Sequence, residues 1–177
     1  VLGIGDNFPL ELWVNGARAL RIQPDVSSPI WLGGSSDNAV TAGASGVVIG
    51  GGGAGGFLIG SASCRASCSN RATDAFGTIA GGVGNQVGDD AGQPDDRPFA
   101  TVGGGLGNIA SGSAATVAGG FQNRATGPYA LVSGGSNSHA SAFYATVAGG
   151  EGNLASGQNS IVLGGSSNVA SGAHSVA

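Results

Sequence analysis

The sequence contains no lysine and no methionine, and charged residues make up only 9% of its 177 positions. Six arginines stand against ten acidic residues, for a net charge of −4. Nucleic acids and anionic membrane surfaces are bound through basic stripes, so this balance argues against both as partners. No apolar run approaches the roughly 18 residues of a membrane span, so no direct membrane insertion is expected. No signal peptide is apparent, and a start at Val1 suggests a fragment or a processed product.

Residues that carry catalysis or bind metals are also scarce. Cys64 and Cys68 are the only cysteines, and His139 and His174 lie far from them in sequence. A zinc site normally needs four nitrogen or sulfur ligands, so the pair is interpreted as a disulfide that closes a small loop, with two buried thiols as the alternative. No Ser-His-Asp spacing or shielded carboxylate pair is present. We therefore expect no catalytic residues, no cofactor and no enzymatic activity.

One glycine pattern resembles a dinucleotide fingerprint: Gly51, Gly53 and Gly56 follow an apolar run, and Asp74 lies about twenty residues further on. The residues that follow are apolar and strand-like, so no helix N-terminus is expected to hold a pyrophosphate. Without a lysine, phosphate-loop interpretations fail as well.

What the sequence does contain is a repeat. Five gapless 15-residue units begin at Thr101, Thr116, Leu131, Thr146 and Ile161. Position 2 is always Val, positions 4 and 5 are Gly-Gly, position 10 is Ala, and position 11 is Ser or Thr. The glycines disfavour helix, and the alternation around positions 2 and 10 is that of short strands. One unit is therefore predicted to form one coil of an all-β solenoid, with coils stacked about 4.8 Å apart.

The predicted interior is thin, because its inward positions hold one Val and otherwise Gly and Ala. Such a stack buries little apolar area, which favours association with further copies. Position 14 supports this expectation with an aromatic column of Phe76, Phe99, Tyr129 and Tyr144, interrupted by Ala114. The column is interpreted as interface packing, with a glycan-stacking strip as the alternative.

Position 8 forms a second column, which is predicted to be a structural Asn ladder that fixes the register at a turn. Its members are Asn70, Asn85, Asn108, Asn123, Asn153 and Asn168, with Ser138 in the gap. The hydroxyl column at position 11 raises ice binding as an alternative. It provides one such position per coil rather than a flat two-column face.

The 15-residue units resemble the head repeats of trimeric autotransporter adhesins, the YadA-like β-roll. The closing segment 170–177, ASGAHSVA, is similar to that family's ASGxxSVA pattern. The Gly-Gly-x-x-Asn variant also resembles repeats of phage-type tail-fibre and bacterial surface fibre proteins. The resemblance covers about residues 30–177. It implies a left-handed parallel β-roll, homotrimeric, with three rolls packed side by side.

The N-terminal region differs from the repeats. Residues 10–24 read as a β-hairpin on an Asn15-Gly16 type I′ turn, with Leu12 expected opposite Ala19 and Trp13 opposite Arg18. Residues 1–29 are interpreted as a hairpin cap and linker, and residues 30–177 as the β-roll domain. Less regular coils are expected to start at residues 30, 47, 63 and 78, which gives nine coils and a length of roughly 43 Å.

The coil that starts at Thr78 carries an insertion, residues 88–98, with four aspartates. Asp89, Asp90, Asp95 and Asp96 form a candidate calcium site, because calcium prefers oxygen ligands. The alternative is a solvated loop, and the spacing matches no EF-hand.

These observations favour a non-enzymatic structural or adhesive segment of an extracellular trimeric fibre, at the cell surface or on a virion. A tail-fibre shaft is one alternative within this class. A monomeric solenoid that binds glycan or ice is another. The expected partners are further copies of the chain and a surface glycan or protein.

Overall fold

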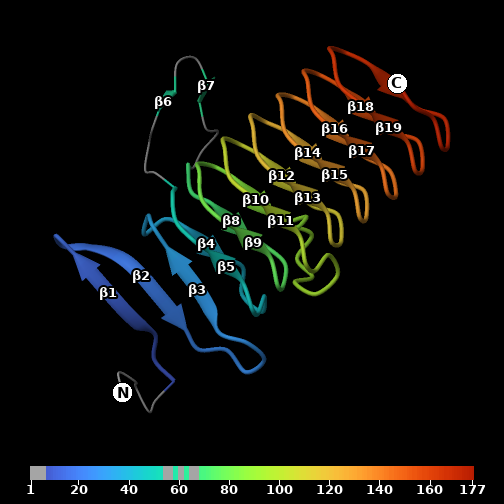
Figure 1. The fold of residues 1–177 in the computed structure, drawn as a ribbon. Helices are drawn as coiled ribbons and strands as arrows, with labels where there is room; N and C mark the ends of the chain where they lie inside the picture. The colour runs from blue at the N-terminus through green and yellow to red at the C-terminus, as the bar shows by residue number, and fades with distance from the viewer. Residues whose placement is uncertain (1–6, 54–57, 60–61, 64–67) are drawn as a thin grey trace.

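The computed structural model describes residues 7–53, 58–59, 62–63 and 68–177. Within these ranges the chain is all β-strand and turn, and it winds into a parallel β-solenoid whose coils stack along one axis (Figure 1). Two long sheets run the length of the stack. No helix in the described ranges is long and apolar enough to cross a membrane.

The first sheet, sheet A, has ten strands in spatial order. They are β1 (Leu10–Val14), β2 (Ala17–Gln23), β3 (Ile30–Gly33), β5 (Val48–Ile49), β9 (Thr78–Ile79), β11 (Thr101–Val102), β13 (Thr116–Val117), β15 (Leu131–Val132), β17 (Thr146–Val147) and β19 (Ile161–Val162). Sheet B has eight strands. They are β4 (Ala39–Val40), β8 (Arg71–Ala72), β10 (Gln86–Val87), β12 (Ile109–Ala110), β14 (Arg124–Ala125), β16 (His139–Ala140), β18 (Leu154–Ala155) and β20 (Val169–Ala170).

The repeat period sets the register from β11 onward. Thr101 pairs with Thr116 in sheet A, and Ile109 pairs with Arg124 in sheet B. Position 6 of each unit adds a third column of single bridges, such as Leu106 to Phe121. One coil is therefore a sheet A strand at positions 1 and 2, a first turn, a sheet B strand at positions 9 and 10, and a second turn.

The core is a column of small apolar side chains between the two sheets. Val102 and its equivalents at position 2 are fully buried, as are the alanines at position 10 such as Ala110. Gly at position 5 is required by close packing: Gly105 has φ +90°, and a Cβ there would lie 2.2 Å from the carbonyl oxygen of Gly120. The glycine-rich first turn thus permits the small coil spacing.

The number and register of the first coils differ from the sequence prediction. Trp31 pairs with Val48 and Val48 pairs with Thr78, so these coils start at residues 31 and 48 rather than 30 and 47. The predicted coil at residue 63 is wrong, because β5 pairs directly with β9. The chain from Val48 to Thr78, twice as long as a regular repeat, makes one coil whose connection includes a separate antiparallel pair, β6 (Leu58–Ile59) and β7 (Ala62–Ser63). The described solenoid therefore has eight coils, not nine.

The N-terminal hairpin joins sheet A rather than standing apart. β1 and β2 pair around Asn15 and Gly16, both at positive φ, and β2 continues antiparallel onto β3. Leu12 lies opposite Leu20, not Ala19 as predicted, because the register shifts between Leu12 and Trp13. Trp13 does lie opposite Arg18.

Candidate functional site

The outer face of sheet A carries one uninterrupted row of uncharged side chains. Residues directly paired across strands share a face, and position 2 is buried, so position 1 points outward. The pairings connect eleven such residues across the sheet, from the hairpin to the last coil. This outer row of sheet A is Leu10, Ile22, Trp31, Val48, Thr78, Thr101, Thr116, Leu131, Thr146, Ile161 and Val176.

The hairpin has an apolar face and a charged face, and its apolar face continues the outer row of sheet A. Leu10 pairs with Ile22, and Ile22 pairs with Trp31, which is 45% exposed. The neighbouring row holds Glu11 and Arg21, whose side chains pair at 3.6 Å. Arg21 is in register with the buried Leu32. The hairpin thus turns its charged residues toward the end of the core and its apolar residues outward.

The outer row of sheet B is mixed in character. It includes Arg71, Gln86, Arg124 and His139. Burial, and then the neighbouring Arg124 guanidinium, lower the pKa of His139. Its Nε2 lies 2.8 Å from the Thr126 hydroxyl. Charges on this face make it a poorer surface for packing against another copy than sheet A.

The Asn column lies inside the first turn, where the side chains are buried rather than displayed. Nδ2 of Asn123 donates to the carbonyls of Gly119 (3.0 Å) and Gly135 (2.8 Å), and its Oδ1 accepts the amide of the next coil. The same pattern holds for Asn70, Asn85, Asn108 and Asn153. It also includes Asn38, which the sequence analysis missed. Asn168 closes the ladder in the last coil.

The aromatic column lies on the second turn and is exposed. Phe76, Phe99, Tyr129 and Tyr144 are each between 41% and 57% exposed. Phe76 and Phe99 stack at a centroid distance of 5.2 Å, and Tyr129 and Tyr144 at 5.0 Å. Phe143, at position 13, adds edge contacts to both tyrosines, at 5.5 and 4.5 Å. The sequence analysis did not include Phe143 in the column.

Backbone conformation makes this column unusual. All four aromatic residues have φ between +56° and +67°, and the other residues at position 14 also have positive φ. Such a backbone is unfavourable for a bulky residue, at about 1–3 kcal/mol each, and stacking of a ring pair recovers about 0.5–1.5 kcal/mol. Asn159 and His174, at the same position, belong to types that tolerate positive φ better. Rings at this position are therefore held in place by the fold despite an unfavourable local preference.

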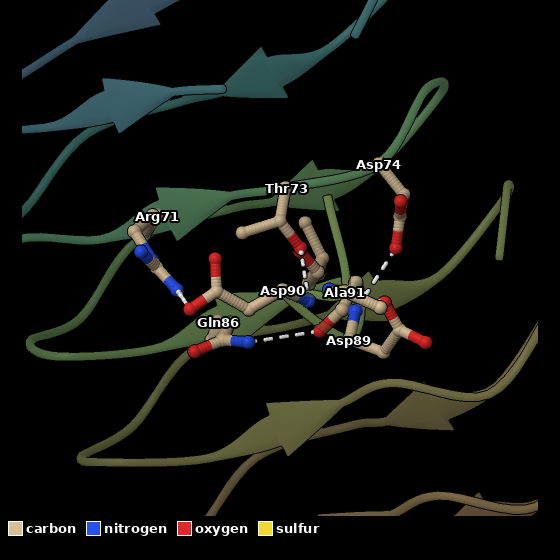
Figure 2. Close-up of polar contacts among 9 residues, drawn as sticks. Arg71, Thr73, Asp74, Gln86, Asp89, Asp90 and Ala91 are labelled. Atoms are coloured by element: carbon tan, nitrogen blue, oxygen red, sulfur yellow. Dashed lines mark hydrogen bonds and ion pairs between the residues drawn. The ribbon is translucent and has the colours of Figure 1, made fainter. Parts of the chain in front are cut away.

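The inserted loop folds back onto the preceding coil (Figure 2). The Asp89 amide donates to Oδ2 of Asp74 at 2.9 Å, and the Asp90 amide donates to the Thr73 hydroxyl at 3.1 Å. Asp90 forms an ion pair with Arg71, and Gln86 donates to the Gly88 carbonyl at 2.9 Å. These polar contacts anchor the start of the loop to residues that precede it in the chain.

The carboxylates that come together differ from the predicted calcium set. Asp74, Asp89 and Asp96 have oxygens within 4.8 Å of one another, whereas Asp90 and Asp95 are not part of this group. Asp74 is buried, and its burial, more than the nearby Asp89 and Asp96 charges, raises its pKa. The predicted calcium set did not include Asp74, although Asp74 lies one repeat length before Asp89.

The Asp group has internal partners of its own. Besides the amide contact to Asp74, the Asp89 carboxylate accepts the Ala91 amide at 2.9 Å and lies 3.5 Å from Nε of Arg97. Oxygen ligands suit calcium, and the three carboxylates define where calcium would bind in this loop. The calcium assignment stays a prediction.

Of the two cysteines, Cys68 is buried and disulfide-bonded. Cys64, the only other cysteine in the chain, lies outside the described residues. The Gly51–Gly56 pattern lies partly outside them as well. Its described part, Gly51 to Gly53, belongs to the first turn, where Gly52 occupies the close-packed position 5.

No protein-family model matches this chain, and no curated protein matches its sequence.

Proposed function

We propose that this chain is a non-enzymatic structural and adhesive segment of an extracellular fibre, in which three copies pack through the outer row of sheet A. A surface adhesin and a virion tail-fibre shaft are the two settings that fit this role. A rigid β-solenoid spaces and presents a binding surface, and its stability is a sum over neighbouring coils.

The observation that carries this proposal is the outer row itself. It crosses ten strands without a charged residue, and four of its members are more than a third exposed: Trp31, Val48, Ile161 and Val176. The exposed apolar members form a pair near each end of the row, and uncharged threonines and Leu131 lie between them; apolar surface that stays exposed in one chain is typical of a protein interface. The interior of one solenoid supplies only one Val per regular coil and otherwise small or polar residues, so packing through this face would add apolar burial that a single chain lacks.

The hairpin fits the same role. Its charged row, with the Glu11–Arg21 pair, covers the open end of the core as a cap, while its apolar row lengthens the interface. Caps of this kind prevent the first coil from pairing with other chains.

The test is the native mass in solution, by light scattering on a sizing column. The proposal predicts three times the 16.8 kDa of one chain. Leu131→Asp places a carboxylate in the middle of the outer row, where packing would desolvate it, so we expect dissociation to monomers. Leu154→Asp is the matched control, because Leu154 is also half-buried but lies on sheet B.

A wild-type monomer would contradict the trimer, as would a trimer that survives Leu131→Asp. The monomeric result would favour the second candidate, a single-chain solenoid that uses an exposed column to bind glycan or ice.

A further inference from the structure

The aromatic column is interrupted at one coil, and the interruption leaves ring faces uncovered. Position 14 reads Phe76, Phe99, Ala114, Tyr129 and Tyr144 in successive coils. The Ala114 amide donates to the Pro98 carbonyl at 2.9 Å, and the Tyr129 amide donates to the Ser113 carbonyl at 2.8 Å. Ala114 has φ +52°, close to the value of its aromatic neighbours, so it occupies the same place in its coil and only lacks the ring.

The orientation of the rings shows where the free faces point. Phe76 and Phe99 are within 15° of parallel at 5.2 Å, and Tyr129 and Tyr144 are within 25° at 5.0 Å. Parallel rings this close overlap face to face rather than lie edge to edge, and the spacing matches the coil rise of about 4.8 Å. Ring faces are therefore directed along the column, and Phe99 and Tyr129 each present one toward Ala114.

We propose that Phe99, Ala114 and Tyr129 form a slot that binds one sugar ring of a neutral glycan between two aromatic faces. Two coil steps separate the walls, about 9.6 Å, which leaves room for one ring layer at stacking distance from each wall. The half-buried Ala114 methyl group is the floor. The proposal deepens the adhesive part of the proposed function, on which it rests, by naming the class of ligand.

The chemistry around the slot selects the ligand. The residues at positions 13 and 14 of the three coils carry no charge, which favours a neutral ligand; they are Pro98, Phe99, Ser113, Ala114, Pro128 and Tyr129. Arg97, which precedes Pro98, is paired with Asp89. The walls are 57% and 49% exposed, so a bound ring would have its faces covered and its edge in water.

That combination fits a pyranose better than an aromatic side chain. A pyranose has apolar C–H faces and a rim of hydroxyl groups that stay hydrated. An aromatic side chain gains most when its edge is desolvated too, as in the closed pockets of protein–protein hot spots.

The experiment is affinity electrophoresis of the whole chain in gels that contain neutral polysaccharides: a glucan, a mannan, a galactan and a xylan. We expect at least one to retard the wild-type protein. Ala114→Tyr fills the slot with a ring whose backbone conformation Tyr129 and Tyr144 already adopt, so retardation should weaken at least tenfold. The control Asn159→Tyr adds a ring at the same turn position, beyond Tyr144, and leaves the slot open.

Retardation by none of the four polysaccharides would overturn the proposal, as would equal retardation of wild type and Ala114→Tyr. If Ala114→Tyr melts below wild type, Phe99→Leu with Tyr129→Leu provides a second loss of the slot without filling it. Native mass is measured on each variant so that the two proposals are tested separately. A monomer that binds glycan would contradict the trimer but not the slot. A trimer that binds no glycan would contradict the slot but not the trimer.

Discussion

Replacing Ser138 by Asn should stabilise the solenoid, because Ser138 is the one interruption in the Asn ladder. Its hydroxyl donates to the Ser136 carbonyl at 3.3 Å and accepts the Asn153 amide at 3.2 Å. It leaves the carbonyls of Gly134 and Gly150 without the side-chain donor that an Asn would provide. In the preceding coil, Asn123 supplies both equivalent bonds.

The size of the effect follows from two added bonds. Each neutral hydrogen bond is worth about 0.5–1.5 kcal/mol net, and the Asn side chain loses some rotamer freedom, so we expect about 1–2 kcal/mol. For a chain of this size that is roughly 2–8 °C in Tm. Space is available, because position 5 of the same coil is Gly135, as it is Gly beside every Asn of the regular coils.

The assay compares thermal and denaturant unfolding of wild type, Ser138→Asn and the reverse control Asn123→Ser. The control removes two existing bonds and should lose a similar amount. Repeat proteins can unfold in parts, so amide hydrogen exchange of the flanking coils shows whether the change is local. A Ser138→Asn protein no more stable than wild type, with Asn123→Ser also neutral, would refute the view that these side chains hold the first turn together.

Three other polar groups, two of them buried and one half-buried, give further predictions. Ser160→Ala should stabilise by about 1–2 kcal/mol in denaturant unfolding, because the buried Ser160 hydroxyl has no hydrogen-bond partner among the described residues, whereas Ser175→Ala, which loses a 2.7 Å bond, should not. His139 has a lowered pKa, so its contribution to stability is complete above pH 6.5 and is lost as pH falls below that value; His139→Gln should flatten this part of the Tm-against-pH curve. Asp74 has a raised pKa, so its charged form destabilises the fold near neutral pH and the penalty is relieved on acidification. Asp74→Asn should therefore raise Tm near neutral pH and converge with wild type in acid, and a Tm increase with calcium in wild type that Asp74→Asn abolishes would support a calcium site.

The regular coils could be predicted from sequence because every repeat has the same residues at the same buried and turn positions. Val at position 2 and Ala at position 10 recur often enough to fix which side chains point inward. The repeat pattern did not predict that the Asn side chains point inward and are buried in the first turn. Asn at a turn has several local uses, and its bonds here depend on carbonyls of the next coil, which are set by the stacking distance.

The irregular coils show where periodicity loses its power. The separation of Val48 and Thr78 is two repeat lengths, which is compatible with two coils by arithmetic. Asn70 fits position 8 whether the chain from Val48 to Thr78 makes one long coil or two regular coils. The local pattern therefore cannot distinguish these two paths of the chain. The direct pairings of β5 with β9 and of β4 with β8 decide it. The proximity of Asp74 to Asp89 could have been predicted, because both occupy position 12, where the regular units have Gly or Ala, and they are one repeat length apart.

The two insertions lie at opposite edges of the solenoid: β6 and β7 fall in the first turn of the coil that starts at Val48, and residues 88–98 fall in the second turn of the next coil. The Asn ladder continues past the first insertion, because Asn70 still donates to the carbonyls of Gly51 and Gly82. The second turn has no such ladder in the coils that the structure describes. It is where the inserted residues after Asp89, the aspartates of position 12 and the aromatic column all lie. Because the second turn combines an inserted loop with a column of exposed rings, recognition is expected at this edge, while sheet A is left for packing against further copies.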